Sequence, residues 1–404
     1  MSDDLALRIA YLERQVAQLT LGLGHVDETA ILPEIAMQTA LADAISALTP
    51  LKPLLDDDSI NDILINGSKN VYVERFGKLE KTDLTFPSDA HVFAIAESIA
   101  AHIGRHVSVR KPLLDARLPD GSRVNVIMHP LAVDGTTISI RKFAKRSITL
   151  DDMAKNSNVS NGLSEFLKVV ARCRLNIIVS GGTGSGKTTL LNAISEHIDA
   201  NERIVTIEDA AELRLQQPHV VRLETRPVRT DRREEEVGIR DLMKNALRMR
   251  PDRILVGEVR GAEAFDMMQA MNTGHEGSLT TIHANHPRDA LARLENMINM
   301  ANLNLPTQAI RSQIASAVHL VVQISRMRDG QRRVTFVSEV VGMESDIITM
   351  QDLFSFHVKG EGNDGKLLGE FKWSGIMPRF LRRVGYYEQG ENLSAALGIK
   401  LPKM

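Results

Sequence analysis

The sequence predicts an α/β protein in which a large domain built on a parallel sheet follows a smaller α+β domain and an N-terminal helical segment. Three observations support this fold class. Strand-like apolar runs alternate with helical patterns from residue 175 onward, which is typical of a parallel sheet with crossover helices. Shorter alternating runs separated by turn residues fill residues 58–143. The 404 residues also exceed one ordinary domain.

Composition limits the classes of function. Hydrophobic residues make up 43% and charged residues 25%, and the net charge of -2 gives no general attraction to nucleic acid or to an anionic membrane. The single cysteine, Cys173, excludes an internal disulfide and a multi-cysteine zinc site, so we expect a buried, inert thiol. The start MSDDLALRIA is acidic where a signal peptide is basic, and no apolar run approaches the ~18 residues of a membrane span. These features predict a cytosolic protein.

The first 57 residues are helical in pattern, with one break. The break is LGLGHVDETAILPE, which indicates a flexible segment, so we assign residues 1–33 to an N-terminal arm and residues 34–57 to a helical segment. The arm has too few heptads for a coiled-coil dimer to be favoured over a packing helix. Apolar residues spaced by four and three carry its pattern: Leu5, Ile9, Leu12, Val16 and Leu19.

Residues 58–143 predict a small α+β domain. The stretch INDILINGSKNVYVERFGKLEKTDLTF contains short strands, with turns at Asn66, Gly67 and Gly77. A helix is expected at residues 88–103. The runs HVSVRKPLL, SRVNVIMH and TTISIRKF, separated by PDG and DG turns, predict three more strands. The polar residues 144–160 that follow are interpreted as a linker.

A phosphate-binding motif is present in LNIIVSGGTGSGKTTLLNAISEHI, residues 175–198. The spacing matches GxxxxGK[ST], between a strand pattern and a helix pattern that disfavour a chance Gly-rich turn. Backbone N–H groups of such a loop wrap phosphates, Lys187 reaches the β and γ phosphates, and Thr188 offers its hydroxyl to Mg²⁺. We therefore expect ATP with Mg²⁺, bound by Gly181, Gly182, Thr183, Gly184, Ser185, Gly186, Lys187, Thr188 and Thr189.

Carboxylates end two later strand patterns, RIVTIEDAAEL at residues 203–213 and DRILVGEVRG at residues 252–261. Because parallel strands end at one edge of a sheet, we expect Glu208, Asp209 and Glu258 to converge on the phosphates. Gly257 and Glu258 stand where a usual Walker B strand ends in Asp. One glutamate would hold the metal and the other would orient water, and the residues leave open which does which. Two solvated loop acids are the disfavoured alternative.

Three histidines lie in AMNTGHEGSLTTIHANH, residues 270–286. His275, His283 and His286 match no zinc template such as HExxH, so we reject a metal site. SLTTI at residues 278–282 predicts a strand, and His283 at its end is interpreted as a sensor of the γ phosphate or of its water. His275 would be a loop partner, and a structural role is an equal alternative for His275 and His286.

Four motifs in this order resemble those of the type II and type IV secretion ATPases. GGTGSGKT resembles their Walker A motif, TIEDAAEL their Asp box, LRMRPDRILVGEVRG their Walker B motif and NTGHEGSLTTIHAN their His box. DARLPDGSRVN, ISIRKF and GEFKWSGIMPRFL most closely resemble the CpaF-type ATPases of Tad (tight adherence, Flp) pili. The resemblance covers about residues 34 to 399.

The resemblance implies a hexameric ring in which ATP and Mg²⁺ bind between a PAS-like N-terminal domain, residues 58–143, and a RecA-like ATPase domain, residues 161–404, with a C-terminal extension. Family roles make Glu208 the general base and Glu258 the metal ligand beside Thr188. Motif position implies γ-phosphate-sensing arginines at Arg117, Arg123 and Arg141. No arginine of the P-loop half stands obviously at the phosphates, so a further one would act in trans from the segment holding Arg240 and Arg248.

The implied function is a cytoplasmic motor for Tad pilus assembly or secretion, at the inner face of the bacterial cytoplasmic membrane. Inner-membrane platform proteins would be its partners and would hold it peripherally at the membrane. A conjugation-type secretion ATPase is one alternative, and a RecA-like motor on nucleic acid is another. Dense arginines in residues 222–253 favour the latter, but acidic residues interrupt the run, namely Glu234, Glu235 and Glu236, and it lacks aromatic residues. We therefore expect no nucleic-acid partner.

The C-terminal residues 301–404 predict a helix and then a hairpin. The strands VHLVVQIS and RRVTFVSEVV would join around Asp329 and Gly330 and extend the sheet. MPRFLRRVGYYEQG predicts a further helix, either packed on its own domain or touching a membrane partner.

Overall fold

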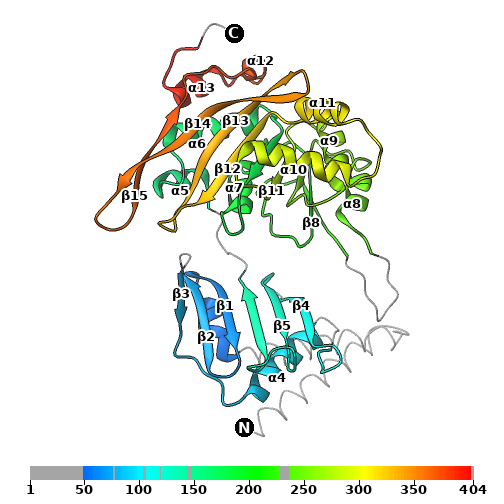
Figure 1. Cartoon of the computed structure of the whole chain (residues 1–404), viewed down its shortest axis with the longest axis vertical. Coiled ribbons are helices and arrows are strands. Elements are labelled where there is room, and N and C mark those ends of the chain that lie inside the picture. The colour runs from blue at the N-terminus through cyan, green and yellow to red at the C-terminus, as the bar shows by residue number, and fades with distance from the viewer. Residues whose placement is uncertain are drawn as a thin grey trace, which may run out of the picture. The chain divides into compact units, whose positions relative to one another are not determined.

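The computed structural model describes residues 49–75, 78–102, 106–118, 120–142, 148–226 and 236–401. The chain divides into two compact units, Met1–Lys145 and Arg146–Met404 (Figure 1). The predicted N-terminal arm and most of the helical segment lie outside the described residues. The described end of that segment is helical and consists of η1 (Thr49–Leu51) and α3 (Lys52–Asp56).

The N-terminal unit is an antiparallel sheet covered on one face by a helix. Its strand order is β3-β2-β1-β6-β5-β4, and α4 (Asp89–His102) packs against the buried face. Period-two alternation puts Ile63, Ile65, Val124 and Ile140 into this core and turns the intervening residues to the other face. The strands are β1 (Ile60–Asn66), β2 (Asn70–Arg75), β3 (Lys78–Lys81), β4 (Leu113–Arg117), β5 (Arg123–Ile127) and β6 (Thr137–Arg141).

One predicted strand of this unit is displaced. The run HVSVRKPLL was expected to be a strand, but β4 begins only at Leu113 and continues to Arg117. Residues 108–111 instead form a turn closed by reciprocal backbone hydrogen bonds between Ser108 and Lys111, of 3.1 and 2.9 Å. Pro112 follows this turn and has no N–H to donate to a strand ladder, so regular pairing starts after it.

The C-terminal unit is built on a nine-stranded sheet of the order β15-β14-β13-β12-β7-β11-β10-β8-β9. The six strands from β12 to β9 are parallel, whereas β13, β14 and β15 form an antiparallel extension. The predicted strands and the hairpin around Asp329 are confirmed, but β9, β14 and β15 were not predicted. The strands are β7 (Ile177–Ser180), β8 (Ile204–Glu208), β9 (Val220–Glu224), β10 (Arg253–Val256), β11 (Leu279–Ile282), β12 (Leu320–Arg326), β13 (Arg332–Glu344), β14 (Ile347–Glu361) and β15 (Leu367–Trp373).

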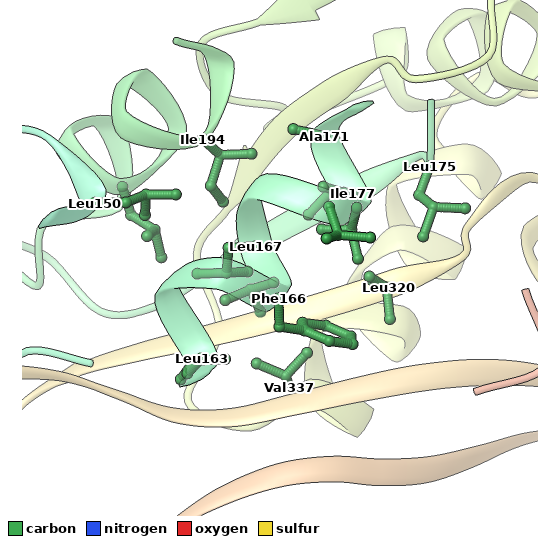
Figure 2. Packing of buried hydrophobic residues seen from close by; sticks show 14 of the residues in the cluster. Leu150, Leu163, Phe166, Leu167, Ala171, Leu175, Ile177, Ile194, Leu320 and Val337 are labelled. Atoms are coloured by element: carbon green, nitrogen blue, oxygen red, sulfur yellow. The ribbon is translucent and has the colours of Figure 1, made fainter. Parts of the chain in front are cut away.

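Helices cover both faces of this sheet and give two separate cores. On one face, α6 inserts Phe166 and Leu167 against Ile177, Leu320 and Val337 of the strands (Figure 2). The helices of this face are α5 (Leu150–Lys155), α6 (Asn161–Arg172), α7 (Lys187–Ser195), α12 (Leu381–Tyr386) and α13 (Gly390–Leu397). The other face is covered by α8 (Ile239–Ala246), α9 (Glu263–Asn272), α10 (Pro287–Asn299) and α11 (Thr307–Ala317).

The segment interpreted as a linker belongs largely to the C-terminal unit. Residues 143–147 are outside the described part of the chain, but residues 148–160 contain α5. Thr149 caps this helix, because its side chain accepts a hydrogen bond from the Asp152 N–H. Leu150 and Met153 are buried in the α6 core. The polar composition of the segment concealed a short helix that contributes two buried side chains, and the half-buried Ala154, to the core.

The remaining predictions for the C-terminal unit concern Cys173 and the last helices. Cys173 is buried as expected, and burial raises the pKa of its thiol to about 12. Phe380 and Val384 of the MPRFLRRVGYYEQG segment are buried against the same core, so α12 packs on its own unit. Among the described helices, none has both the length and the apolar character needed to cross a membrane.

The half-buried His319 is expected to make the stability of the C-terminal unit depend on pH. Its Nδ1 accepts a hydrogen bond of 2.9 Å from the Asn176 N–H, which requires an unprotonated Nδ1. Burial, with a smaller contribution from Arg383, lowers the pKa of His319 from 6.5 to about 4. The unfolded chain therefore binds a proton at a higher pH than the folded one. We expect the free energy of unfolding to fall by about 3 kcal/mol as pH drops from 6.5 to 4.

This expectation can be measured by urea unfolding followed through Trp373, the single tryptophan, which lies in β15 of the same unit. The control is His319→Asn, which keeps a hydrogen-bond acceptor in place of Nδ1 but does not titrate. The pH slope of its unfolding free energy should be smaller than that of the native chain. Equal slopes would show that His319 does not carry the effect.

Candidate functional site

The GGTGSGKT loop connects β7 to α7 at the C-terminal end of the parallel strands. Its start is fixed, because the Gly181 N–H donates to the Ile282 carbonyl at 3.3 Å. A Cβ on Gly181 would lie 2.4 Å from the Ile324 carbonyl oxygen, so only glycine fits there. Gly184 and Gly186 have positive φ angles of 68° and 97°, which favour glycine. The motif thus forms the strand, turn and helix predicted for it.

The loop has the features of an anion site. No side chain among the described residues caps α7 at Gly186, so the first N–H groups of the helix stay available to a ligand. The Lys187 ammonium crosses the loop and donates to the carbonyls of Gly181 and Gly182 at 3.1 and 3.0 Å. Thr188 follows in the first turn and is half-buried. Amides, a cation and a hydroxyl on one turn fit a phosphate group with its metal ion.

Glu208, Glu258 and His283 all lie at the same edge of the sheet as this loop. Glu208 is the last residue of β8, Glu258 follows β10 by two residues, and His283 directly follows β11. The order β7-β11-β10-β8 places these strand ends beside one another, and all four strands run parallel. These residues therefore share one edge of the sheet, and their convergence on the phosphates stays a prediction.

Hydrogen bonds join the strand ends into one rigid edge. Thr281 Oγ1 donates to the Gly257 carbonyl at 2.7 Å, and the Val259 N–H donates to the Thr281 carbonyl at 3.0 Å. The Ala284 carbonyl, next to His283, accepts from Gln323 Nε2 at 3.1 Å. Thr281 and Gln323 were missed from the sequence. The signal that could have found them is a polar residue inside an otherwise apolar strand pattern.

Glu208 is almost completely buried, with 3% of its surface exposed. Its Oε1 accepts hydrogen bonds from the N–H groups of Glu212 and Leu213 at 2.8 and 3.0 Å, so the carboxylate anchors the turn after β8. Burial raises the pKa of Glu208, and these backbone hydrogen bonds oppose the rise. A Cβ on Gly257 would lie 2.9 Å from Glu208 Cγ. Glycine before Glu258 therefore lets the two glutamate-bearing strands approach.

Glu258 is half-buried and paired with Arg260, which the sequence analysis did not single out. Arg260 Nη2 lies 2.7 Å from Glu258 Oε2, and Arg260 Nη1 lies 3.5 Å from Asp209 Oδ2. Asp209 is exposed and directly follows Glu208 at the end of β8, so Arg260 contacts acidic side chains from two neighbouring strand ends. The carboxylate of Glu258 is thus held in place by a side chain that is itself largely exposed.

The three histidines do not form a cluster. His275 precedes β11, whereas His283 follows it, so they lie at opposite ends of one strand. His286 caps α10, because its Nδ1 accepts from the Arg288 N–H at 3.3 Å, and its ring packs on Phe336 at 5.2 Å between centroids. Only His283 is at the glutamate edge.

Arg117, Arg123 and Arg141 form a row across the N-terminal unit. They are direct cross-strand partners on β4, β5 and β6, and Asp62 of β1 continues the row opposite Arg141. Partners in such a row share one face of the sheet, here the face away from the buried core. Burial raises the pKa of Asp62, and Arg141 opposes the rise. The arginines implied by motif position are thus gathered in one strip of positive charge.

The arginines expected in trans differ from each other. Arg240 forms an ion pair with Asp266 at 2.9 Å that joins α8 to α9, so this side chain is engaged within its own unit. Arg248 is exposed. The sequence shows no arginine of the P-loop half obviously at the phosphates, but the structure places one against the loop itself, because Arg332 Nε donates to the Gly184 carbonyl at 3.0 Å. Arg332 lies almost 150 residues from the motif in sequence, and a strand-forming hairpin brings it there.

A model of the protein family described as type II/IV secretion system protein matches residues 45–362. The conjugal transfer protein TrbB of Rhizobium radiobacter is 35% identical over 294 residues, covering 72% of this chain and 85% of TrbB. The type IV secretion system protein PtlH of Bordetella pertussis is 36% identical over 313 residues, covering 70% of this chain and 90% of PtlH.

Solved structures agree in fold. The ATPase DotB of Yersinia pseudotuberculosis superposes with a TM-score of 0.53 at 18% identity, over 74% of this chain and 79% of DotB. The pilus retraction motor PilT, solved with bound ADP, gives a TM-score of 0.50 at 18% identity, over 85% of this chain and 88% of PilT. The mixed α/β fold, with its RecA-like ATPase domain, is the fold of these ATPases.

Proposed function

This chain belongs to the type II/IV secretion system protein family, and from that premise we propose that it is a hexameric motor that hydrolyses ATP to drive Tad-type pilus assembly or secretion. The observation that carries the hydrolytic part is the single sheet edge that holds the P-loop, Glu208, Glu258 and His283. A site that only held a nucleotide would need no buried carboxylate beside it.

Each residue of this edge has a role in the proposed reaction. Lys187 and the amides of the loop bind the phosphates, and Thr188 and Glu258 would hold Mg²⁺. When bound, the metal neutralises charge on the phosphate oxygens. Glu208 is the proposed base that orients water and accepts its proton, because burial and two backbone N–H groups fix its carboxylate. His283 is the proposed sensor of the γ phosphate.

The Tad-pilus role rests on the three segments that resemble CpaF-type ATPases, which lie on β4 and β5, on β6, and on β15 with the start of α12. Under this proposal the motor is cytoplasmic, works at the inner face of the membrane and is held there by inner-membrane platform proteins. A conjugal transfer role is the second candidate, favoured by the 35% identity with TrbB. Deleting the gene would decide between them: loss of pili supports the first role, and loss of plasmid transfer with intact pili supports the second.

Lys187→Ala should abolish ATP hydrolysis and leave the fold intact. The lysine contributes a positioned charge to the phosphates, and it is half-buried rather than part of a core. The measurement is phosphate release together with thermal unfolding. Lys155→Ala, at the end of α5, is a charge-matched control. Normal turnover in the Lys187 variant would end the ATPase proposal.

Glu208→Gln and Glu258→Gln should each lower kcat by about 10² or more. Substitution of the metal ligand should also weaken the binding of Mg²⁺-ATP, whereas substitution of the base should leave this binding intact. Calorimetry on both variants assigns the two roles. Burial raises the pKa of Glu208, so this carboxylate is protonated at a higher pH than an ordinary glutamate, whose pKa is 4.5. As the pH is lowered, turnover by the native chain should therefore begin to fall while the pH is still above 4.5. Two variants that bind and hydrolyse like the native chain would refute the proposed convergence.

Arg123→Ala and Arg141→Ala should cost far more turnover than nucleotide affinity, because an arginine at the transferring phosphoryl group is worth roughly 10³ to 10⁵ in rate. Arg110→Ala is the matched control, since Arg110 is exposed in the same unit. Turnover should also depend on assembly into hexamers. Light scattering and specific activity across a dilution series test this, and a monomer that keeps the full specific activity would contradict the ring.

A further inference from the structure

Arg332 contacts the phosphate loop from outside its motif. Its Nε donates to the Gly184 carbonyl at 3.0 Å, and its Cδ lies 3.3 Å from the position of a Cβ on Gly186. Among the described residues, no hydrogen-bond partner is recorded for its two Nη groups, so both remain able to donate. The side chain is half-buried. A guanidinium with unused donors therefore rests on the loop that is proposed to bind phosphates.

The backbone around Arg332 is rigid, because the turn that precedes it is closed by a buried ion pair. Asp329 and Arg333 are paired at 2.8 Å, with 1% and 4% of their side chains exposed. A second contact between the same carboxylate and guanidinium measures 3.0 Å, which makes the pair bidentate. The Met327 N–H also donates across the turn to the Gln331 carbonyl at 2.8 Å. Arg332 thus starts β13 from a fixed position.

Asn158 fixes the backbone of Arg332 through hydrogen bonds. Its side-chain Nδ2 donates to the Arg332 carbonyl, and its own carbonyl accepts from the Val334 N–H at 2.9 Å. Asn158 follows α5, in the stretch that enters the C-terminal unit from the junction between the two units. The position of Arg332 on the loop therefore depends on this entering segment as well as on the hairpin.

A hydrogen bond to the Gly184 carbonyl affects the amide on the other side of the same peptide. The peptide plane is rigid and trans, so a carbonyl held toward Arg332 turns the Ser185 N–H in the opposite direction. The hydrogen bond also polarises that N–H, and the guanidinium adds positive charge beside the loop. These effects act on the loop itself. They should be the same for a nucleoside diphosphate and a triphosphate.

We infer that Arg332 is a positioning residue of the phosphate loop, which fixes the Gly184 peptide and supplies a second cation from the same chain, and that Asn158 fixes Arg332. This inference rests on the proposed nucleotide site. Interactions that are equal in the ground state and the transition state change KM and leave kcat unaltered. The role of Arg332 is thus distinct from that proposed for the arginines of the N-terminal unit.

The test compares Arg332→Met, which keeps the aliphatic stem beside Gly186, with Arg332→Lys and with the control Arg328→Ala. Arg328 lies in the same turn, but it pairs with Glu361 at 2.8 Å. In the full-length chain we expect Arg332→Met to weaken ADP and a non-hydrolysable ATP analogue equally, by about tenfold, and to raise KM with kcat within about twofold. Arg332→Lys should recover part of the affinity, and Arg328→Ala should bind like the native chain.

Asn158→Ala should give a smaller loss of affinity than Arg332→Met, and the double variant should lose no more than Arg332→Met alone, since Asn158 acts through Arg332. Melting temperatures without nucleotide report whether each variant folds. If Arg332→Met does not fold, Arg332→Lys carries the test through its intermediate affinity for ADP.

Three outcomes would overturn the inference. The positioning role would be refuted if Arg332→Met bound ADP with native affinity, or if Arg332→Lys did so in the case that Arg332→Met does not fold. A loss confined to kcat would also refute it. Additive losses in the double variant would remove the role of Asn158. A native chain that binds neither ADP nor the analogue would instead refute the proposed function, which is a separate and recognisable result.

Discussion

The parallel hydrogen-bonded register of β7, β11, β10 and β8 is the constraint on which the site depends. Neighbouring parallel strands with matched registers must end at one edge, and their adjacent termini carry the P-loop, His283, Glu258 and Glu208. The cores on the two faces hold this register, since Ile177 of β7 packs under α6 while Val205 of β8 packs under the opposite helices. The grouping of these residues at one edge is therefore a consequence of the strand order.

Hydrogen bonds of buried polar groups fix the geometry of this edge. Thr281 joins β11 to the residue before Glu258, and Gln323 joins β12 to the residue after His283. Glu208 binds two backbone amides of its own turn. In a low-dielectric interior such hydrogen bonds are strong when satisfied and costly when lost, so each one limits how far its neighbours can move. The metal ion and water of the proposed reaction would require this kind of support.

Sequence reasoning located the edge because its signals are local. The GGTGSGKT spacing, the apolar runs before Glu208 and Glu258, and the SLTTI run before His283 can each be read within about ten residues. Features that depend on pairing between distant segments were missed. β14 pairs with β13 and with β15, and its buried residues Leu353 and Phe354 join a core formed largely by elements far away in the sequence, as do two side chains of α5. Arg332 reaches the P-loop because β12 pairs with β7 and the hairpin after β12 returns the chain along it as β13.

Arg332 and the arginines of the N-terminal unit differ in what fixes their positions. Arg332 belongs to the unit that contains the loop, and its hydrogen bond to Gly184 ties it to the loop whether or not the rest of the chain moves. Arg117, Arg123 and Arg141 stand in one row of a separate sheet, where cross-strand pairing sets their spacing but not their distance from any phosphate. A cation fixed to the loop can contribute to holding a nucleotide. Under the proposed function, a strip of cations on a separate unit could couple nucleotide state to the movement of that unit.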